Sequence, residues 1–582
     1  MLHINFGETN KITLDKGWKL VPDPMGRCRR QKWWKSIRKE GYFFPSYDDD
    51  AFWDTKVPAS YNIVHENLEF YEGDVVFLNK FSLKPADKNE RIYLSFGAVN
   101  DNCEVFLNGK YLGGHQGCYQ RFTFDITDVA QAENRLLIIS DATRTNESVP
   151  GYMHDWFHFG GIVREVEVYY KPTVFVRDAK IALTIDGENA VIDLACLPDA
   201  SGRLKKEIRF TLVDADGKIV FDETILGHCN VWNNRTVIIP LNKLNLWSPD
   251  MPYLYKYTVI VDDDIWTDTV GLREIRTEGK QILLNGQNIV LKGVAAWTAD
   301  ERGLFSIGSE KAKKTVDLLK DLHANFARAG HCPPSREFVK ECDRRGILLW
   351  LETPAYWIDD MQRPARTKNA MNALSSMLIE YRNSPSAIIW SVGNECLRIY
   401  QSEIQNNLPY FIEAAEFARE HDPSRLVAFT GGFEGAGEEN VEYPKLLIDK
   451  LDVIAINTYA GINDGNDEPP VFDLNYKKLE MLSKYNKPVM FAEIGIDAVL
   501  GEKGFDFGEQ RQADFMVKVM KLFEDSLKNG TIQGLSVFAL TDFRTPLKLG
   551  RYQKGYNRKG LLTVDFKPKK AYNVVKDTYK RI

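Results

Sequence analysis

The apolar residues follow two different patterns along the chain, and the pattern changes near residue 276. Before that point, short apolar runs of strand length are separated by turn residues, as in RIYLSF (91–96) and RLLIIS (135–140). After it, apolar runs alternate with longer amphipathic segments in which apolar residues recur at helical spacing. The pattern therefore predicts a β-rich first part followed by an α/β second part.

Residues 1–172 are predicted to form a β-sandwich. Strand-like runs continue at 102–114 and 163–170, and no convincing helical period of any length appears among them. Asn108-Gly109 lies between two apolar runs, which is a strong signal for a two-residue hairpin turn.

A second β segment, residues 173–275, is predicted to form an immunoglobulin-like sandwich. Several strands at regular spacing over about 100 residues are typical of that fold. The strand-like runs lie at 174–185, 190–197, 207–214, 235–241 and 253–263.

Residues 276–582 are predicted to form a (β/α)8 TIM barrel. Parallel strands buried on both faces are near-continuous apolar runs, and eight such runs occur, at 288–294, 325–329, 347–352, 387–392, 426–430, 451–459, 488–493 and 533–540. Helical segments lie between most of them, for example at 310–322, 335–345, 402–420 and 508–529. Eight alternating units over about 300 residues match a barrel. A doubly wound open sheet is the alternative, but it needs a glycine-rich phosphate loop that the sequence lacks.

Composition narrows the classes of function. With 44% hydrophobic and 27% charged residues, the chain resembles an ordinary soluble globular protein. A net charge of −6 argues against nucleic acid or an anionic membrane as a partner. The basic cluster at residues 27–39 is most simply a solvated surface loop, and binding of an acidic partner is the alternative.

The sequence also bears on compartment and cofactors. No apolar run approaches the roughly 18 residues of a transmembrane helix, and the N-terminus lacks the regions of a signal peptide. We therefore expect a cytoplasmic protein, or a periplasmic one if a cleaved signal preceded this chain. The 8 cysteines are scattered without a CxxC pair, which predicts free thiols. No metal pattern such as HExxH occurs, and we expect neither a metal nor an organic cofactor.

Polar residues follow the predicted barrel strands at the end where the active sites of this fold lie. They are Arg328, His331, Glu352, Asn394, Glu395, Asn457, Tyr459, Glu493 and Asp542. Several carboxylates, a histidine and a tyrosine are thus predicted to converge on one barrel mouth.

Glycoside hydrolysis requires such a set of side chains. One carboxylic acid protonates the leaving oxygen, and a second carboxylate attacks the anomeric carbon or activates water. Glu395 follows the fourth predicted strand and Glu493 ends the seventh, so the two can face each other across a closed barrel. Carboxylates that merely cap the following helices are the alternative.

Sequence runs along nearly the whole chain resemble glycoside hydrolase family 2. Runs similar to its N-terminal domain are VPASYN (57–62), YEGDVVFLNKFSL (71–83), VFLNGKYLGGHQGCYQRFTFDIT (105–127) and HDWFHFGGIVREV (154–166). Runs similar to its second domain and barrel are LWSPDMPYLY (246–255), GLREI (271–275), ILLNGQNIVLKGV (282–294), NFARAGHCPP (325–334), CDRRGILLWLETP (342–354) and IIWSVGNE (388–395). The resemblance implies a sugar-binding jelly roll, an immunoglobulin-like domain and a catalytic barrel.

The resemblance also implies roles for single residues. In that family the glutamate of the Asn-Glu pair after the fourth strand is the general acid/base, which is Glu395 here, and Asn394 is positioned for the sugar 2-hydroxyl. The glutamate that ends the seventh strand is the nucleophile, here Glu493. Tyr459 matches a tyrosine near the nucleophile. His331 matches a sugar-contacting histidine, although its neighbours depart from the family's S-H-Y-P motif.

Two further features resemble the members of the family that cleave glucuronides. Asn557-Arg558-Lys559 resembles an Asn-x-Lys motif whose amide and ammonium bind the substrate carboxylate. Asp155 lies in a run that resembles an N-terminal-domain loop reaching the active site. The alternatives are a turn before the last barrel segment for the motif, and a loop cap for Asp155.

The sequence departs from the family at two places on the predicted rim of the sugar pocket. The family's Arg-His-Glu-Asp-like stretch after the first strand is replaced by residues 295–300, AAWTAD. A tryptophan that is common after the last strand is replaced by Phe538. The catalytic pair is untouched, so the departures bear on the sugar, its linkage or what lies beyond it.

The resemblance implies a retaining exo-β-glycosidase that removes a terminal β-linked hexuronic acid, with a glucuronide favoured. A β-galactosidase or β-galacturonidase of the same family is the alternative. A non-catalytic carbohydrate-binding protein is an alternative of another class. The expected partners are an oligosaccharide, a polysaccharide or a glycoside conjugate. The sequence leaves the oligomeric state open, a homo-oligomer included.

Overall fold

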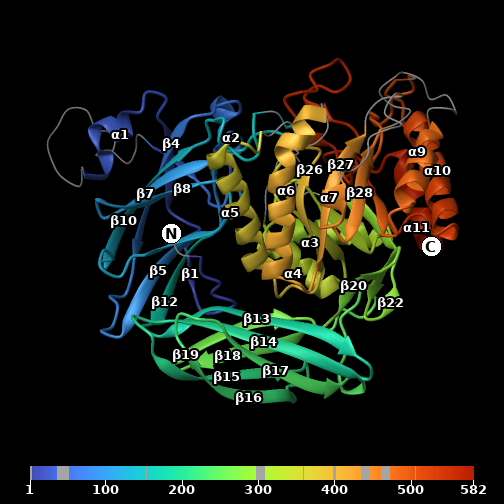
Figure 1. Ribbon diagram of the computed structural model, residues 1–582. Coiled ribbons are helices and arrows are strands. Elements are labelled where there is room, and N and C mark those ends of the chain that lie inside the picture. The colour runs from blue at the N-terminus through green and yellow to red at the C-terminus, as the bar shows by residue number, and fades with distance from the viewer. Residues whose placement is uncertain are drawn as a thin grey trace.

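The computed structural model describes residues 3–35, 52–152, 154–296, 308–357, 360–396, 401–433, 445–459, 472–504 and 506–582. Figure 1 shows three parts in chain order: a β-sandwich, a second β-sandwich below it, and a barrel surrounded by helices. Among the described residues, no helix combines the length and the apolar character needed to cross a membrane.

The N-terminal part is a sandwich of two main sheets with a shared apolar core. The six-stranded sheet has the order β3 (Trp53–Thr55), β2 (Trp18–Pro22), β4 (Asp74–Ser82), β10 (Glu133–Asp141), β7 (Asn102–Leu107) and β8 (Lys110–Gln116). The four-stranded sheet has the order β1 (Ile12–Thr13), β12 (Val166–Pro172), β5 (Glu90–Phe96) and β9 (Phe122–Asp125). The predicted hairpin between β7 and β8 is confirmed, with Asn108 and Gly109 at φ 51° and 82°.

The middle part is a smaller sandwich of a three-stranded and a four-stranded sheet, which confirms the immunoglobulin-like prediction. The first sheet is β13 (Phe175–Asp186), β14 (Asn189–Asp199) and β17 (Asn233–Pro240). The second is β16 (Ile219–His228), β15 (Lys205–Val213), β18 (Tyr255–Val261) and β19 (Asp264–Val270). The predicted limits of the domains at 172/173 and 275/276 stay a prediction.

The third part is a closed barrel of eight parallel strands, so the (β/α)8 prediction is confirmed and the open sheet is excluded. The strands are β23 (Leu291–Ala295), β24 (Phe326–Ala329), β25 (Leu348–Glu352), β26 (Ala387–Asn394), β27 (Leu426–Phe433), β28 (Val453–Thr458), β29 (Val489–Ile494) and β30 (Gly534–Val537). The helices around them are α3 (Ser309–Asp321), α4 (Arg336–Arg345), α5 (Pro364–Tyr381), α6 (Gln401–His421), α7 (Lys445–Ile448), α9 (Leu474–Ser483), α10 (Glu509–Lys528) and α11 (Lys570–Arg581).

Burial on both faces explains the continuous apolar runs of the barrel. In β28, Val453 and Ala455 belong to the core inside the barrel. The alternate residues Ile454 and Ile456 belong to the core between the strands and the helices. Neither face of such a strand meets water, so polar residues are confined to its ends. The polar residues after the last apolar position therefore lie at the barrel mouth.

The N-terminal sandwich contacts the barrel through buried charges. Arg121 forms an ion pair with Glu165 of its own domain and donates from Nε to Glu380 of α5 at 2.9 Å. Burial alone would raise the pKa of Glu380, but the charges of Arg121 and Arg336 hold it well below its usual range. Arg164 also donates to the carbonyl of Pro333, two residues beyond His331. This interface places the loop around Asp155 against the strand ends of the barrel.

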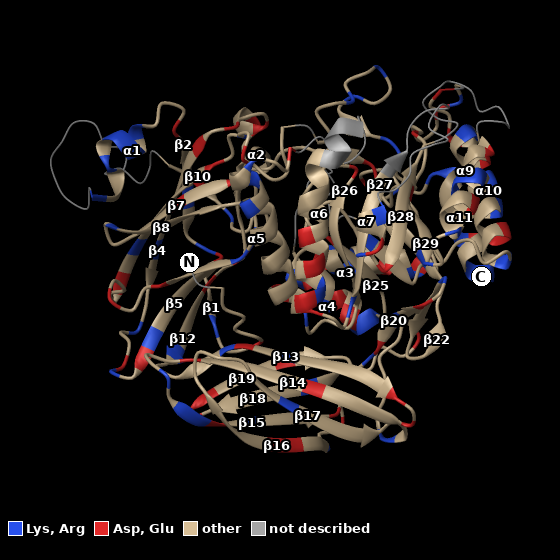
Figure 2. Ribbon diagram, viewed as in Figure 1, with Lys and Arg blue, Asp and Glu red and all other residues tan. Residues whose placement is uncertain are grey.

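The first residues of the basic cluster, predicted as part of a solvated loop, instead form a short helix, α1 (Arg27–Gln31), on the N-terminal sandwich (Figure 2). Arg29 of this helix pairs with Asp74 and, at 2.9 Å, with Glu104. Part of the cluster's charge is thus offset within its own domain. Residues 36–51 lie outside the described residues and include Arg38 and Lys39 of the cluster.

Candidate active site

A fully buried arginine organises the barrel mouth. Arg328, at the end of β24, has no exposed surface, and its Nη2 donates to Glu352 Oε2 at 2.9 Å and to Asn394 Oδ1 at 2.8 Å. Its Nη1 donates to Glu493 Oε1 at 2.5 Å. Burial alone would raise the pKa of Glu352, but the charge of Arg328 and a bond from His331 lower it from 4.5 to about 2. Glu352 is therefore ionised at neutral pH.

Asn394 and Glu395 leave β26 in a sharply turned backbone. A Cβ on Gly393 would lie 2.8 Å from the ring of Phe411, so this position before the pair accepts only glycine without rearrangement. Glu395 has a φ of 56°, in the left-handed region, and its N–H donates to the carbonyl of Thr430 at 2.8 Å. This turn directs the carboxyl group of Glu395 into the mouth instead of along the strand.

One asparagine joins the pair after β26 to the neighbouring strands. The Asn457 amide, at the end of β28, donates to Asn394 Oδ1 at 3.1 Å and to Glu395 Oε1 at 2.9 Å. Asn394 Oδ1 also accepts from Arg328, whereas Asn394 Nδ2 is buried without a hydrogen-bond partner among the described residues. A buried donor without a partner is costly, so this amide group is suited to bind a hydroxyl of a ligand.

Glu493, at the end of β29, accepts hydrogen bonds on both carboxylate oxygens. Oε1 accepts from Arg328, and Oε2 accepts from the hydroxyl of Tyr459 at 2.5 Å. His331 contributes as well, with Nε2 3.3 Å from Glu493 Oε1 and Nδ1 2.7 Å from Glu352 Oε1. Burial first, and then the charges of Glu493 and Glu395, raise the pKa of Tyr459 well above its usual value. Tyr459 is therefore a neutral hydroxyl donor near both carboxylates.

Aromatic rings from two domains form the wall beside His331. The Trp156 ring stacks on the His331 ring with centroids 5.5 Å apart and meets the Tyr356 ring edge-on at 4.8 Å. Phe538, the residue in place of the tryptophan common in family 2, belongs to the same apolar cluster and packs edge-on against Phe543. The wall of the mouth is thus aromatic despite this departure.

Asp155 joins the N-terminal domain to the last segment of the barrel. Its Oδ1 accepts from the hydroxyl of Thr545 at 2.7 Å and its Oδ2 from the amide of Asn557 at 2.7 Å. The Asn557 side chain in turn accepts from the backbone N–H of Lys559 at 3.1 Å. These contacts are more than a cap of the loop around Asp155, because they hold the Asn-x-Lys motif against another domain.

Lys559 extends toward Tyr459, which follows β28 and hydrogen-bonds Glu493 at the end of β29. Its ammonium lies 5.4 Å from the centre of the Tyr459 ring and donates to Asp497 Oδ2 at 3.0 Å. Burial alone would raise the pKa of Asp497, but the charges of Lys559 and Lys548 hold it well below its usual range. The Lys559 ammonium therefore lies against the ring of Tyr459, whose hydroxyl donates to Glu493.

All eight residues predicted for the site lie in this one assembly. They are Glu395, Glu493, Asp155, His331, Asn394, Tyr459, Asn557 and Lys559. Their individual roles stay a prediction. Sequence reasoning missed Asp497 and Lys548, and the only signal for Asp497 was its position four residues after Glu493.

Two other sequence expectations have different outcomes. Asp542, expected at the mouth, is bound to the ammonium of buried Lys569 at 2.7 Å and to the N–H of Gly560 at 3.1 Å. Burial raises the pKa of Asp542 to about 6 against the opposing charge of Lys569. Its contacts are thus structural. In the stretch 295–300, the run from Trp297 to Asp300 lies outside the described residues.

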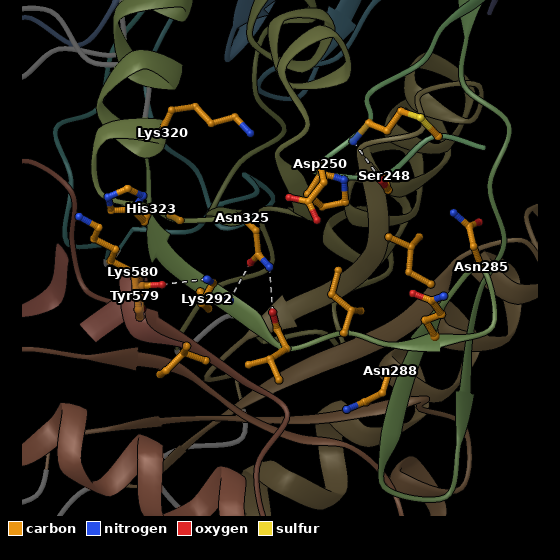
Figure 3. A pocket seen from close by; sticks show the side chains of 18 of the residues that line it. Ser248, Asp250, Asn285, Asn288, Lys292, Lys320, His323, Asn325, Tyr579 and Lys580 are labelled. Carbon is orange, nitrogen blue, oxygen red and sulfur yellow. Dashed lines mark hydrogen bonds between the residues drawn. The ribbon is translucent and has the colours of Figure 1, made fainter. Parts of the chain in front are cut away.

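A cavity of about 800 Å³ lies at the opposite end of the barrel, where β23 and β24 begin (Figure 3). Lys292 donates to the carbonyl of Tyr579 at 2.8 Å and Lys320 to that of Gly346 at 3.1 Å, so both bind carbonyl oxygens near helix C-termini. Asp250 is the only carboxylate side chain among the described residues that line the cavity. The cavity lacks the pair of carboxyl groups that glycoside hydrolysis requires.

Family models match the three parts of the chain. A model described as the glycosyl hydrolases family 2 TIM barrel domain matches residues 275–582. The family 2 sugar binding domain matches residues 13–172, and a further glycosyl hydrolases family 2 model matches residues 174–273.

Full-length relatives and solved structures are similar over nearly the whole chain. Beta-glucuronidase of Paenibacillus borealis is 26% identical over 97% of this chain and 95% of its own length, and that of Homo sapiens 24% over 98% and 90%. The structure of Ruminococcus gnavus beta-glucuronidase has a TM-score of 0.87 at 22% identity, covering 100% of this chain and 99% of that chain. Bifidobacterium dentium beta-glucuronidase, complexed with coumarin-3-O-glucuronide, has a TM-score of 0.86 at 24% identity and the same coverage.

Glu352→Gln should lower the free energy of unfolding by about 3 kcal/mol, because Arg328 then stays buried beside an uncharged amide. Urea unfolding at pH 7, followed by tryptophan fluorescence, measures the change. The pKa of Glu352 falls from 4.5 to about 2 on folding, so its contribution is complete above pH 4.5 and is lost as the pH drops toward 2. The difference between wild type and variant should shrink over that window.

Glu524→Gln is the matched control, because Glu524 pairs with the exposed Arg581 at 2.9 Å. Loss of such a surface pair should cost less than about 1 kcal/mol. Equal stabilities of the Glu352→Gln and Glu524→Gln variants would contradict the central role of the buried pair.

Proposed function

The chain belongs to family 2 of the glycosyl hydrolases, and from this membership we propose that it is a β-glucuronidase that removes a terminal β-linked glucuronic acid with retention of configuration. The single observation that carries the sugar assignment is the positive group at the mouth. Lys559 lies beside Tyr459, which hydrogen-bonds Glu493, so a substrate carboxylate at Lys559 would belong to the sugar whose anomeric carbon faces Glu493.

The chemistry of the bound sugar supports this assignment. A hexuronic acid differs from a neutral hexose by one carboxylate, and lysine binds such a group as a point charge with three donors. Asn557 is held beside Lys559 by Asp155, which fixes the motif before the substrate arrives. The beta-glucuronidases of Paenibacillus borealis and Homo sapiens are similar to this chain over nearly their full length, which supports the assignment of a glucuronide substrate.

In the first step of the proposed reaction, Glu493 attacks the anomeric carbon as an ionised carboxylate while Glu395 donates a proton to the leaving oxygen. The contacts support these roles. Glu493 accepts on both oxygens, from Arg328 and Tyr459, as a carboxylate does. Glu395 Oε1 accepts a hydrogen bond from the neutral amide of Asn457 at 2.9 Å, which holds its carboxyl group in the mouth.

In the second step, Glu395 removes a proton from water, and the water attacks the anomeric carbon of the glycosyl-enzyme. The bond to Glu493 breaks, and the β-configured sugar is released. In this proposal Asn394 Nδ2, a buried donor without a hydrogen-bond partner among the described residues, binds the sugar 2-hydroxyl during both steps. Such a bond strengthens in the transition state and lowers the barrier.

Glu493→Ala and Glu395→Ala should each lower kcat on nitrophenyl β-glucuronide by about 10³-fold or more. Azide distinguishes the two roles. In Glu493→Ala, azide replaces the nucleophile and should give the α-glycosyl azide by a single inversion. In Glu395→Ala, azide attacks the glycosyl-enzyme and should give the β-glycosyl azide. Nuclear magnetic resonance of the products identifies the anomer.

Glu524→Gln should retain wild-type kcat, because Glu524 pairs with the exposed Arg581 and has no described contact with the candidate site. Near wild-type turnover in Glu493→Ala, or the same azide anomer from both alanine variants, would refute the assignment of the two roles.

Lys559→Ala should reduce kcat/KM for nitrophenyl β-glucuronide by about 10- to 100-fold, because one charge-assisted contact to the substrate carboxylate is lost. Neutral nitrophenyl β-glucoside and β-galactoside should be much less affected. Lys559 can bind the carboxylate of either uronic acid. The panel therefore also contains nitrophenyl β-galacturonide, whose turnover relative to the glucuronide distinguishes a glucuronidase from a galacturonidase. An equal loss on all four sugars would mean that Lys559 serves only the fold, through Asp497.

A further inference from the structure

A second lysine lies beside the Asn-x-Lys motif. Lys548 belongs to the connection between β31 (Phe543–Arg544) and β32 (Tyr556–Asn557), which pair as an antiparallel hairpin. The backbone carbonyl of Lys548 accepts from the N–H of Gly555 at 2.8 Å, which closes the connection of the hairpin at this lysine. Since β32 ends at Asn557, the hairpin brings Lys548 to the motif that we assign to the substrate carboxylate.

The carboxylates near Lys548 have closer partners than this lysine. Its Nζ lies 3.6 Å from Asp155 Oδ2 and 3.9 Å from Asp497 Oδ2, which is beyond hydrogen-bonding distance. Asp155 accepts at 2.7 Å from each of two neutral groups, and Asp497 accepts from Lys559 at 3.0 Å. Lys548 thus lies within ion-pair distance of both carboxylates without a hydrogen bond to either.

The two lysines differ in their electrostatic surroundings. Burial alone would lower the pKa of Lys559, but the charge of Asp497 at hydrogen-bonding distance raises it above its usual value. Burial first, and then the neighbouring charge of Lys559, lower the pKa of Lys548 from 10.5 to about 8. A bound anion would relieve the repulsion between the two ammonium groups, and Lys548 gains most because its own carboxylate neighbours are farther away.

We propose that Lys548 is a second specificity-determining residue of the active site and binds the substrate carboxylate together with Lys559. This inference rests on the proposed β-glucuronidase function and adds a residue from outside the Asn-x-Lys motif. In this arrangement Lys559 is shared between Asp497 and the substrate, and Lys548, whose carboxylate neighbours lie 3.6 and 3.9 Å away, supplies a second ammonium group. A neutral hexose cannot use this group.

The arrangement has a consequence for pH. The charged groups that face Lys548 are Asp155 of the N-terminal sandwich, Asp497 beyond β29 and Lys559 beyond β32. An anion binds the protonated lysine more tightly than the neutral one, so uronide binding should weaken as free Lys548 loses its proton above about pH 8. Neutral glycosides should not show this loss, whereas any titration of the catalytic pair affects both substrates alike.

The test is the ratio of kcat/KM for nitrophenyl β-glucuronide to kcat/KM for nitrophenyl β-glucoside, measured from pH 6 to pH 10 in the full chain. In wild type, we expect the ratio to fall above about pH 8. In Lys548→Met, we expect it to be about 10- to 100-fold lower at pH 7 and independent of pH. Lys548→Arg keeps its charge at all these pH values and should retain a high, level ratio.

Lys554→Met is the matched control, because Lys554 is exposed on the same hairpin connection and undergoes the same change of side chain. Its ratio should follow wild type. The proposal is overturned if Lys548→Met behaves like Lys554→Met, or if it loses activity equally on both substrates. A wild-type chain that shows no preference for the glucuronide would instead refute the proposed function itself, before any variant is compared.

Discussion

A guanidinium group without access to water is the constraint on which the barrel mouth depends. An isolated buried charge is so unfavourable that Arg328 requires ionised and polar partners on several sides. Glu352 supplies the permanent counter-charge, and Glu493 and Asn394 accept from Nη1 and Nη2, whereas Nε has no hydrogen-bond partner among the described residues. The same bonds that satisfy the arginine therefore hold the proposed nucleophile and the amide beside the proposed acid/base in position, which is preorganisation of the site by the fold itself.

The site is completed by the N-terminal domain. Asp155 anchors the hairpin and the Asn-x-Lys motif, and Trp156 stacks against His331 at the barrel strand ends. The positions of Asp155 and Trp156 depend on the buried interface around Arg121. A loop of one domain holds a fixed place on another domain only when the two domains are packed together. The N-terminal sandwich thus contributes directly to the candidate active site of the barrel.

The sequence predicted the parts of the molecule that follow from burial of single elements. The barrel strands were predicted because both of their faces are apolar, and Glu395 and Glu493 because a carboxylate that ends such a strand can only lie at its mouth. The strand boundaries shifted by a few residues, as for the predicted strand 288–294, which is β23 from Leu291 to Ala295. The basic cluster was predicted as a loop, but its first residues form α1, which is stabilised in part by carboxylates of distant strands that no local pattern reveals.

By itself, the sequence predicted three consecutive domains and two carboxylates at strand ends, because periodicity and strand ends are local properties of the chain. The kind of chemistry came from the resemblance to glycoside hydrolase family 2. Only the tertiary structure decided how charge is distributed at the mouth. Lys559 and Asp497 are separated by 62 positions and Asn557 and Asp155 by 402, yet each pair shares a hydrogen bond. Whether a lysine is neutralised by the protein or left for a substrate depends on such distances and on burial, which arise when distant segments pack together.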